Sequence, residues 1–256
     1  MSDVTILPIS RWPRVRQVIL PTILATGLLA VSGCAKSPST LPASSGTQLI
    51  ITMTVAGHIN PGYTYFVLFN PVAQANQTTG PIPVVGIPWG NGFATGAFTA
   101  FLRYDPSQPN SGYGMYQVVP GTNLLSFAPL AAPTQFTPVS NEPNQNQLQF
   151  QIPLSAIPTG GVTATNLQIN FLATDRIVTN PNDPGTKHID ALGDTRLSSQ
   201  INSFITVPTA TSGLFNNSTA LEPSGDVMLV GSGVSTSDEI QDLDITDWSV
   251  EVRSGS

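Results

Sequence analysis

Residues 246–253 read Thr-Asp-Trp-Ser-Val-Glu-Val-Arg and alternate between two kinds of side chain. Thr246, Trp248, Val250 and Val252 share one face, and the other face carries only polar residues, namely Asp247, Ser249, Glu251 and Arg253. Because successive side chains of a β-strand point to opposite sides, this pattern predicts an antiparallel strand with one buried face. We expect Trp248 to be a core residue.

Similar short segments, separated by Pro and Gly, continue toward the N-terminus. Residues 148–152 and 167–173 also alternate, which predicts Gln168 and Asn170 on an outward face. Residues 63–69 are apolar on both faces, and we expect a central strand that is covered on both sides. Further strands are predicted at 48–55, 96–104, 113–119, 203–207 and 227–230, and single helical turns at 153–158 and 235–243.

The density of these strands decides the fold class. No stretch of about twelve residues has the spacing of an amphipathic helix, and no long period repeats along the chain. We therefore predict an all-β fold, an antiparallel two-sheet β-sandwich of immunoglobulin-like or jelly-roll-like architecture.

The first 33 residues have the pattern of a secretory leader. Arg11, Arg14 and Arg16 precede an apolar run at 18–32, which is shorter than the roughly 20 residues that span a bilayer. The run ends in Val-Ser-Gly-Cys at 31–34, which resembles the lipobox of bacterial lipoproteins. This resemblance implies cleavage before Cys34 and lipid chains on its thiol. An uncleaved membrane-spanning anchor is the alternative interpretation.

The chain divides into three predicted parts. A lipoprotein signal peptide occupies 1–33, the lipidated Cys34 begins a Ser- and Pro-rich tether at 34–47, and a β-sandwich domain occupies 48–256. We expect an exported protein whose acylated Cys34 anchors it to the lipid bilayer of the cell membrane or the outer membrane.

The composition argues against several classes of function. The net charge is −6 and only 9% of residues are charged, so the basic surface that nucleic-acid binding needs is missing. Cys34 is the only cysteine, and the histidines are His58 and His188, which leaves no zinc signature. No Gly-x-Ser-x-Gly motif occurs. We expect no enzyme activity and no cofactor apart from a structural calcium ion.

Two acidic segments, 175–194 and 237–247, offer the oxygen ligands that calcium prefers. The first segment predicts a calcium site formed by Asp183, Asp190 and Asp194. Neither segment matches the EF-hand pattern, and solvated loops with Asx turns are the alternative.

Trp89 stands in a loop rich in Gly and Pro, at 86–93. Together with Phe93, Tyr104, Tyr113 and Tyr116 it predicts an aromatic platform that binds a sugar ring or fills a partner's pocket. In the alternative interpretation, Trp89 folds back over one end of the sandwich as a lid on the core.

Residues 48–253 resemble the sandwich modules of the DOMON and family-9 carbohydrate-binding type in the order of their features. The parallels are the aromatic strand at 63–70, then 149–157, 166–175 and the Asp-Ala-Leu-Gly-Asp motif at 190–194. Members of these families bind haem or sugars, so the resemblance implies a binding module. It transfers no ligand residue to this chain.

Three functions follow from these patterns. We expect a membrane-anchored exported lipoprotein that serves as a non-catalytic binding module for glycans or small molecules. The alternative is a structural or assembly lipoprotein of the cell envelope that binds a protein partner, which a buried Trp89 and an exposed sheet edge would favour. A glycoside-acting enzyme is the third, and it would need two carboxylates such as Asp190 and Asp194 facing one cleft.

Overall fold

The computed structural model describes residues 46–139, 145–218, 222–231, 234–237 and 240–255. The predictions about the signal peptide and Cys34 lie outside the described residues, as does all of the tether except Gly46 and Thr47. In the described part of the chain, no helix has the length and apolar character needed to cross a membrane.

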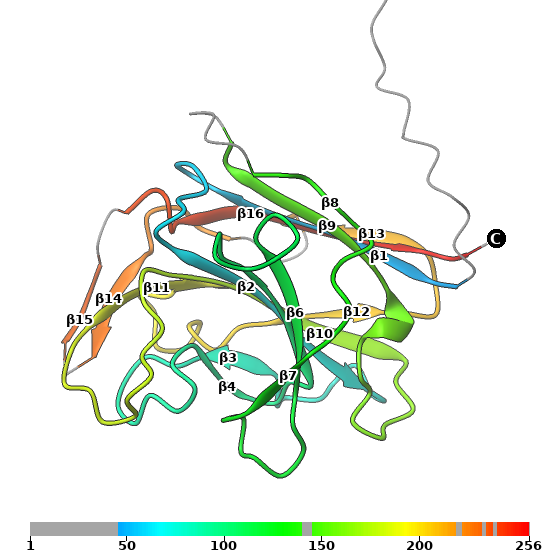
Figure 1. Cartoon of the computed structure of the whole chain (residues 1–256), viewed down its shortest axis with the longest axis horizontal. Helices are drawn as coiled ribbons and strands as arrows, with labels where there is room; N and C mark the ends of the chain where they lie inside the picture. Colours follow the sequence, from blue (N-terminus) through cyan, green and yellow to red (C-terminus); the bar gives the residue numbers. More distant parts are fainter. Residues whose placement is uncertain (1–45, 140–144, 219–221, 232–233, 238–239, 256) are drawn as a thin grey trace, which may run out of the picture. The chain divides into compact units, whose positions relative to one another are not determined.

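Two antiparallel sheets form the sandwich that the sequence predicts (Figure 1). The five-stranded sheet has the order β13 (Gly213–Asn216), β16 (Ile245–Arg253), β1 (Gln48–Val55), β9 (Gln147–Pro153) and β8 (Gln135–Phe136). The nine-stranded sheet has the order β15 (Val234–Ser237), β14 (Met228–Gly231), β11 (Lys187–Ala191), β10 (Asn166–Thr174), β2 (Thr64–Val72), β5 (Ala100–Tyr104), β6 (Tyr113–Val118) and β7 (Phe127–Pro129), and β12 (Ile205–Pro208) also pairs with β10. A separate hairpin joins β3 (Pro81–Pro83) to β4 (Ala94–Gly96).

The main core fills the space between the two large sheets. Met53 of β1 and Trp248 of β16 face Val67 of β2 and Phe171 of β10, and all four side chains are buried. The rings of Phe171 and Trp248 lie 6.0 Å apart at 28°. The prediction that Trp248 belongs to the core is confirmed.

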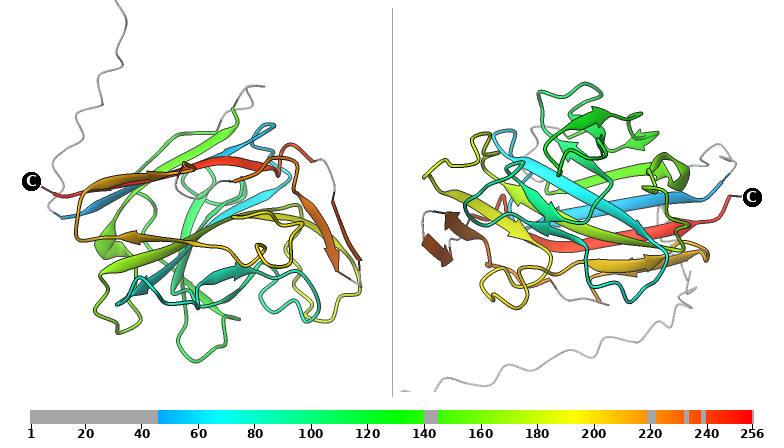
Figure 2. Two further views of the ribbon diagram at one scale, coloured as in Figure 1. Left: turned by 180° about the vertical axis from the view of Figure 1, so that it is seen from behind. Right: turned by 90° about the horizontal axis from the view of Figure 1, so that it is seen from below.

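A second core covers the opposite face of the nine-stranded sheet. Phe66 and Leu68 of β2 pack there with Leu172 of β10, and Trp89 and Phe93 close over them from the loop between β3 and β4. The hairpin of β3 and β4 lies below the nine-stranded sheet in Figure 1 and is seen from behind in Figure 2. Strand β2 is therefore buried on both faces, as its sequence predicts.

This covering layer changes the environment of the polar face of β10. Gln168 and Asn170 point away from the main core, but both are fully buried. Asn170 Nδ2 donates to the carbonyl oxygen of Pro81 at 2.9 Å, and Gln168 Nε2 donates to the carbonyl oxygen of Gln77, in the loop before β3, at 2.8 Å. These amides attach the β3–β4 layer to the sheet, because each satisfies a polar group that has left water.

The start of β16 departs from the predicted alternation. A register shift lies between Thr54 and Val55 of β1, so that Val55 pairs with Ile245 and Thr54 with Asp247. Ile245 consequently occupies the core and Thr246 is half-buried. The prediction that Thr246 lies on the buried face is wrong, because a bulge inserts one extra residue into the strand.

The remaining differences concern short elements. Strands β3, β7, β8, β11, β13 and β15 were not predicted, and each has two to five residues. The turn predicted at 153–158 is the 3₁₀ helix η1 (Leu154–Ala156). The segment 235–243 begins within β15, and a single turn forms at its end, where the backbone nitrogens of Leu243 and Asp244 donate to the carbonyl oxygen of Ile240 at 2.9 and 3.2 Å.

Candidate functional site

Trp89 is an interior residue. Its side chain is 0% exposed, and its Nε1 donates to the carbonyl oxygen of Asp183 at 2.8 Å. Nζ of Lys187 lies 5.2 Å from the ring centroid and donates to the carbonyl oxygen of Gly92 at 2.8 Å. The predicted exposed stacking role is therefore wrong, and the loop folds back over a core. That core is the second one, on the outer face of the nine-stranded sheet.

The other predicted platform residues are divided between the two cores. Tyr104 and Tyr113 pair across β5 and β6 and lie in the main core, with their rings 5.1 Å apart. Phe93 is buried in the second core, and Tyr116 packs half-buried against it. Because the two sets occupy opposite faces of one sheet, they cannot form a common ligand-binding surface.

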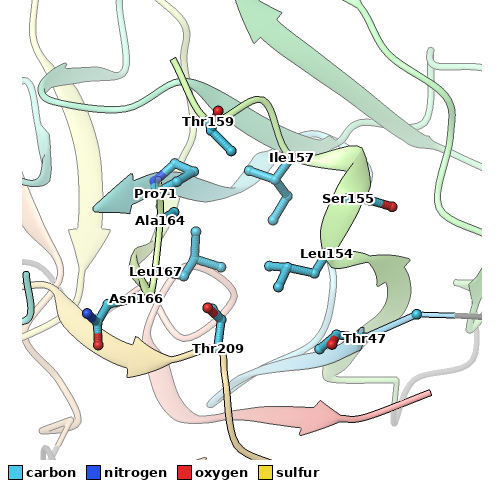
Figure 3. A pocket seen from close by; sticks show the side chains of 11 residues that line it. Thr47, Pro71, Leu154, Ser155, Ile157, Thr159, Ala164, Asn166, Leu167 and Thr209 are labelled. Atoms are coloured by element: carbon cyan, nitrogen blue, oxygen red, sulfur yellow. The ribbon is translucent and has the colours of Figure 1, made fainter. Parts of the chain in front are cut away.

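A different feature, a pocket of about 320 Å³, opens between the two sheets at one end of the sandwich (Figure 3). Thr47 and Leu154 reach it from the five-stranded side, and their backbones are joined by a hydrogen bond of 2.8 Å. Pro71 of β2 and Leu167 of β10, which pair with each other, reach it from the nine-stranded side. We call this the end pocket. Its full lining is Gly46, Thr47, Pro71, Leu154, Ser155, Ile157, Thr159, Ala164, Asn166, Leu167 and Thr209.

The end pocket is apolar with a neutral polar rim. Pro71, Leu154, Ile157, Ala164 and Leu167 supply the apolar surface, whereas hydroxyl groups and one amide come from Thr47, Ser155, Thr159, Asn166 and Thr209. None of its lining residues is charged. This composition matches small-molecule sites, which combine an apolar wall with a few polar groups that fix orientation.

Prolines at strand ends help to keep this end open. Pro71 lies near the end of β2, Pro153 ends β9 and Pro208 ends β12. Because proline donates no backbone hydrogen bond, strands tend to end at it. Leu154 and Thr209, which directly follow Pro153 and Pro208, therefore lie beyond the strands and line the pocket.

The three aspartates predicted to bind calcium do not come together. Asp183 forms an ion pair with Arg176 and accepts from the backbone nitrogen of Gly185 at 2.7 Å. Asp194 accepts from Nε and Nη2 of Arg196 at 2.8 and 2.9 Å. Asp190 is fully buried. The predicted calcium site of Asp183, Asp190 and Asp194 is therefore wrong, because arginines neutralise two of its members.

Asp190 instead belongs to a buried carboxylate cluster with Glu222 and Asp226, one oxygen of each lying within 4.8 Å of the others. Asp190 accepts from the backbone nitrogens of Ala191 at 3.0 Å and Ile245 at 2.6 Å. The bulge at the start of β16 is what presents the Ile245 nitrogen.

The electrostatics of the carboxylate cluster follow from burial. Desolvation, followed by repulsion from Asp226 and Glu222, raises the pKa of Asp190 well above its ordinary value. Desolvation likewise raises the pKa of Glu222 to about 9 and that of Asp226 to about 6. Asp244, on the edge of the cluster, has a pKa raised by burial. Without a cation, the cluster carries protons near neutral pH.

Each histidine lies beside an aspartate other than Asp190 or Asp194. His58 is exposed beside Asp242, with 2.8 Å between Nδ1 and Oδ1, and His188 Nδ1 lies 2.6 Å from Asp175 Oδ2. Asp190 is buried and Asp194 pairs with Arg196. The glycoside-acting alternative requires two carboxylates that face one cleft, and these two do not.

Comparison of the chain with protein-family models, with curated proteins and with solved structures finds no match. The assignment of a function therefore depends on the chain's own residues, above all on those of the end pocket and the carboxylate cluster.

Proposed function

We propose that this chain is an exported, lipid-anchored β-sandwich module that binds a small, neutral, amphipathic molecule in the end pocket and does no chemistry on it. The observation that supports this proposal is the inter-sheet pocket of about 320 Å³. That volume falls at the lower end of the range of roughly 300 to 1,000 Å³ typical of small-molecule sites.

The lining of the end pocket restricts the chemistry of the ligand. A charged group would lose water there without gaining a charged partner, and this is strongly unfavourable. Apolar ligand atoms would lie against Leu154, Ile157 and Leu167, while a hydroxyl or amide group would bind at Asn166 or Thr209. At about 30 Å³ per water-sized unit, the volume admits a ligand of roughly ten non-hydrogen atoms.

The small-molecule form of the binding hypothesis is favoured over the glycan form. Sugar-binding sites commonly stack an aromatic ring on the sugar, but no aromatic residue lines the end pocket. The expected glycan platform around Trp89 is buried in a core.

The proposed anchor would place this pocket near a membrane. Gly46 and Thr47 line the pocket and follow Cys34 by 12 and 13 positions. A fully extended chain of this length spans at most about 45 Å. If Cys34 is acylated, the end pocket stays within that distance of the bilayer, where amphipathic molecules concentrate.

Photolabelling of the full chain with 3-azioctanol tests the proposal. We expect the label mainly on peptides that contain residues 154–159 and 164–167, since these residues line the pocket. An excess of 1-octanol should compete with the label, whereas octanoate and octylammonium of equal chain length should not. Labelling spread evenly over the domain, or equal competition by the charged analogues, would contradict it.

A second function, assembly with an envelope protein, is favoured by one edge of the five-stranded sheet. Strand β13 pairs with β16 and stands last in the order of the described strands. Its Leu214 is 62% exposed. An open edge strand with an exposed apolar residue can accept a strand from a partner. A photo-crosslinker at residue 214 should then trap one defined protein in intact cells. When the crosslinker is placed at a neighbouring position instead, the additional substitution Leu214→Lys should abolish that product.

A further inference from the structure

The carboxylate cluster contains two buried oxygens that lack partners. Among the described residues, Oε1 of Glu222 and Oδ1 of Asp226 are inaccessible to solvent and accept no hydrogen bond. Glu222 is 8% exposed and Asp226 is fully buried. Leaving a buried carboxylate oxygen unsatisfied is costly, so these two atoms indicate a ligand that the protein chain does not itself provide.

The charge of the cluster is also uncompensated by described side chains. The guanidinium group of Arg196 acts electrostatically on Asp226, but it forms its ion pair with Asp194 and donates Nη1 to the carbonyl oxygen of Gly225. Three buried carboxylates without a cation would be strongly destabilising if ionised. Either protons or a bound metal ion must therefore neutralise them.

We propose that Asp190, Glu222 and Asp226 together bind one calcium ion. Ca²⁺ lies about 2.3 to 2.6 Å from its oxygen ligands, so two ligands on opposite sides of it are separated by about 5 Å. The three oxygens lie within 4.8 Å of one another, and one ion can reach all of them. Mg²⁺ needs bonds of about 2.1 Å and usually retains several waters, which suits this buried, widely spaced set less well.

Backbone groups already orient the carboxylates as a metal site requires. Gly193 donates to Oε2 of Glu222 at 2.9 Å, and Thr195 donates to Oδ2 of Asp226 at 2.9 Å. In Glu222 and in Asp226, one carboxylate oxygen is thus held by a backbone nitrogen while the other oxygen remains available. Such outer contacts orient ligands and raise metal affinity.

A second cavity lies beside the carboxylate cluster. It has a volume of about 270 Å³ and is lined by residues that flank the cluster, including Gly225, Val227 and Asp244. The two oxygens of Asp244 accept from the backbone nitrogen of Gly225 at 2.9 Å. Waters in this cavity would complete the six to eight oxygen ligands of calcium. Asp190 comes from β11, whereas Glu222 and Asp226 precede β14, so the ion would tie the second segment to the sheet.

The test measures calcium binding and thermal unfolding of the full chain in detergent. Unfolding is compared between samples that contain calcium and samples that contain EDTA. Wild-type protein should bind one Ca²⁺ by titration calorimetry and should melt at least about 2 °C higher in calcium than in EDTA, the smallest shift expected for about 1 kcal/mol in a domain of this length. Glu222→Gln and Asp226→Asn should each weaken calcium binding at least tenfold. The matched controls Glu251→Gln and Asp183→Asn should leave the calcium affinity unchanged.

The sign of the stability change distinguishes a metal site from a cluster of protonated carboxyls. In EDTA, Glu222→Gln replaces a protonated carboxyl group with a neutral amide of similar size and should melt near the wild-type temperature, whereas in calcium it should melt below wild type. This comparison also shows that the variant folds. The proposal fails if wild type binds no calcium, if Mg²⁺ binds as tightly, or if Glu222→Gln is equally stabilised under both conditions. None of these outcomes depends on the end pocket.

Discussion

The ammonium group of Lys187 lies over the indole ring of Trp89, with 5.2 Å between Nζ and the ring centroid. Both side chains are fully buried, and Nζ also donates to the carbonyl oxygen of Gly92. The loop that the sequence suggests as a flexible ligand platform is therefore fixed to β11 by one lysine. A cation placed over a ring face is stabilised more strongly when water is excluded.

This contact predicts a specific pH dependence of stability. Desolvation lowers the pKa of Lys187 from 10.5 to about 7, although Asp175 opposes the shift. Between these values the unfolded chain binds the proton and the folded protein does not, so the free energy of unfolding rises with pH. Below about pH 7 the cost of the buried charge is fully present.

We expect the difference in unfolding free energy between wild type and Lys187→Met to change with pH. Because the other groups titrate in both proteins, the difference should shift in favour of wild type by about 1.4 kcal/mol per pH unit between pH 7.5 and 9.5. Urea denaturation at several pH values measures it. A difference that is constant over this range would show that Lys187 keeps its proton in the folded state.

Trp89→Ala should act on stability and not on the end pocket. Removing a fully buried tryptophan typically lowers the free energy of unfolding by about 3 to 5 kcal/mol. Labelling of the end pocket by 3-azioctanol should persist under conditions in which the variant remains folded, because Trp89 does not line that pocket. A loss of less than about 1 kcal/mol would mean that the indole ring is not buried as described.

Gly231→Ala should also destabilise the second core. Gly231 has φ +114°, and an added Cβ would lie 2.7 Å from Trp89 Cζ2 and from the carbonyl oxygen of Gly185. We expect a loss of about 1 to 3 kcal/mol in unfolding free energy from strain and overpacking. Gly86→Ala is the matched control, since its added Cβ meets no atom within 4 Å. Equal effects of the two substitutions would contradict the close approach of Gly231 to Trp89.

The proposed lipid anchor predicts a chemical signature of its own. Wild-type chain expressed in a bacterial host should incorporate labelled palmitate and remain with the membrane fraction after a salt wash. Cys34→Ser should lose the label, and its precursor should stay uncleaved. Membrane retention of the Cys34→Ser protein at the mature size would disprove lipidation as the mode of anchoring.

Local periodicity predicted those parts of the fold that depend on a single strand. Residues 48–55 form β1 as expected, and the doubly apolar range 63–69 forms the central part of β2. The alternation of β10 was also read correctly, but its polar residues Gln168 and Asn170 bind a covering layer instead of water. A periodic pattern states which face a residue lies on and not what lies above that face.

The candidate sites depend on contacts between distant segments, and this is why the sequence did not reveal them. Asp190 meets Glu222 and Asp226 from more than 30 positions away, and neither Glu222 nor Asp226 stands in a recognisable metal-binding motif. Asp183 and Asp194, which lie closer to Asp190 in the sequence, are paired with Arg176 and Arg196. The end pocket likewise combines residues from segments that are far apart in the sequence, such as Thr47, Leu154 and Thr209.

The most direct test of the proposed binding function compares two variants of the full chain in 3-azioctanol labelling. Ala164→Phe fills the end pocket, whereas Thr163→Phe adds a phenyl ring at the preceding, exposed position, which does not line it. We predict that Ala164→Phe reduces labelling of the pocket peptides at least fivefold and that Thr163→Phe leaves it unchanged. Equal labelling of both variants and wild type would contradict the end pocket as the binding site.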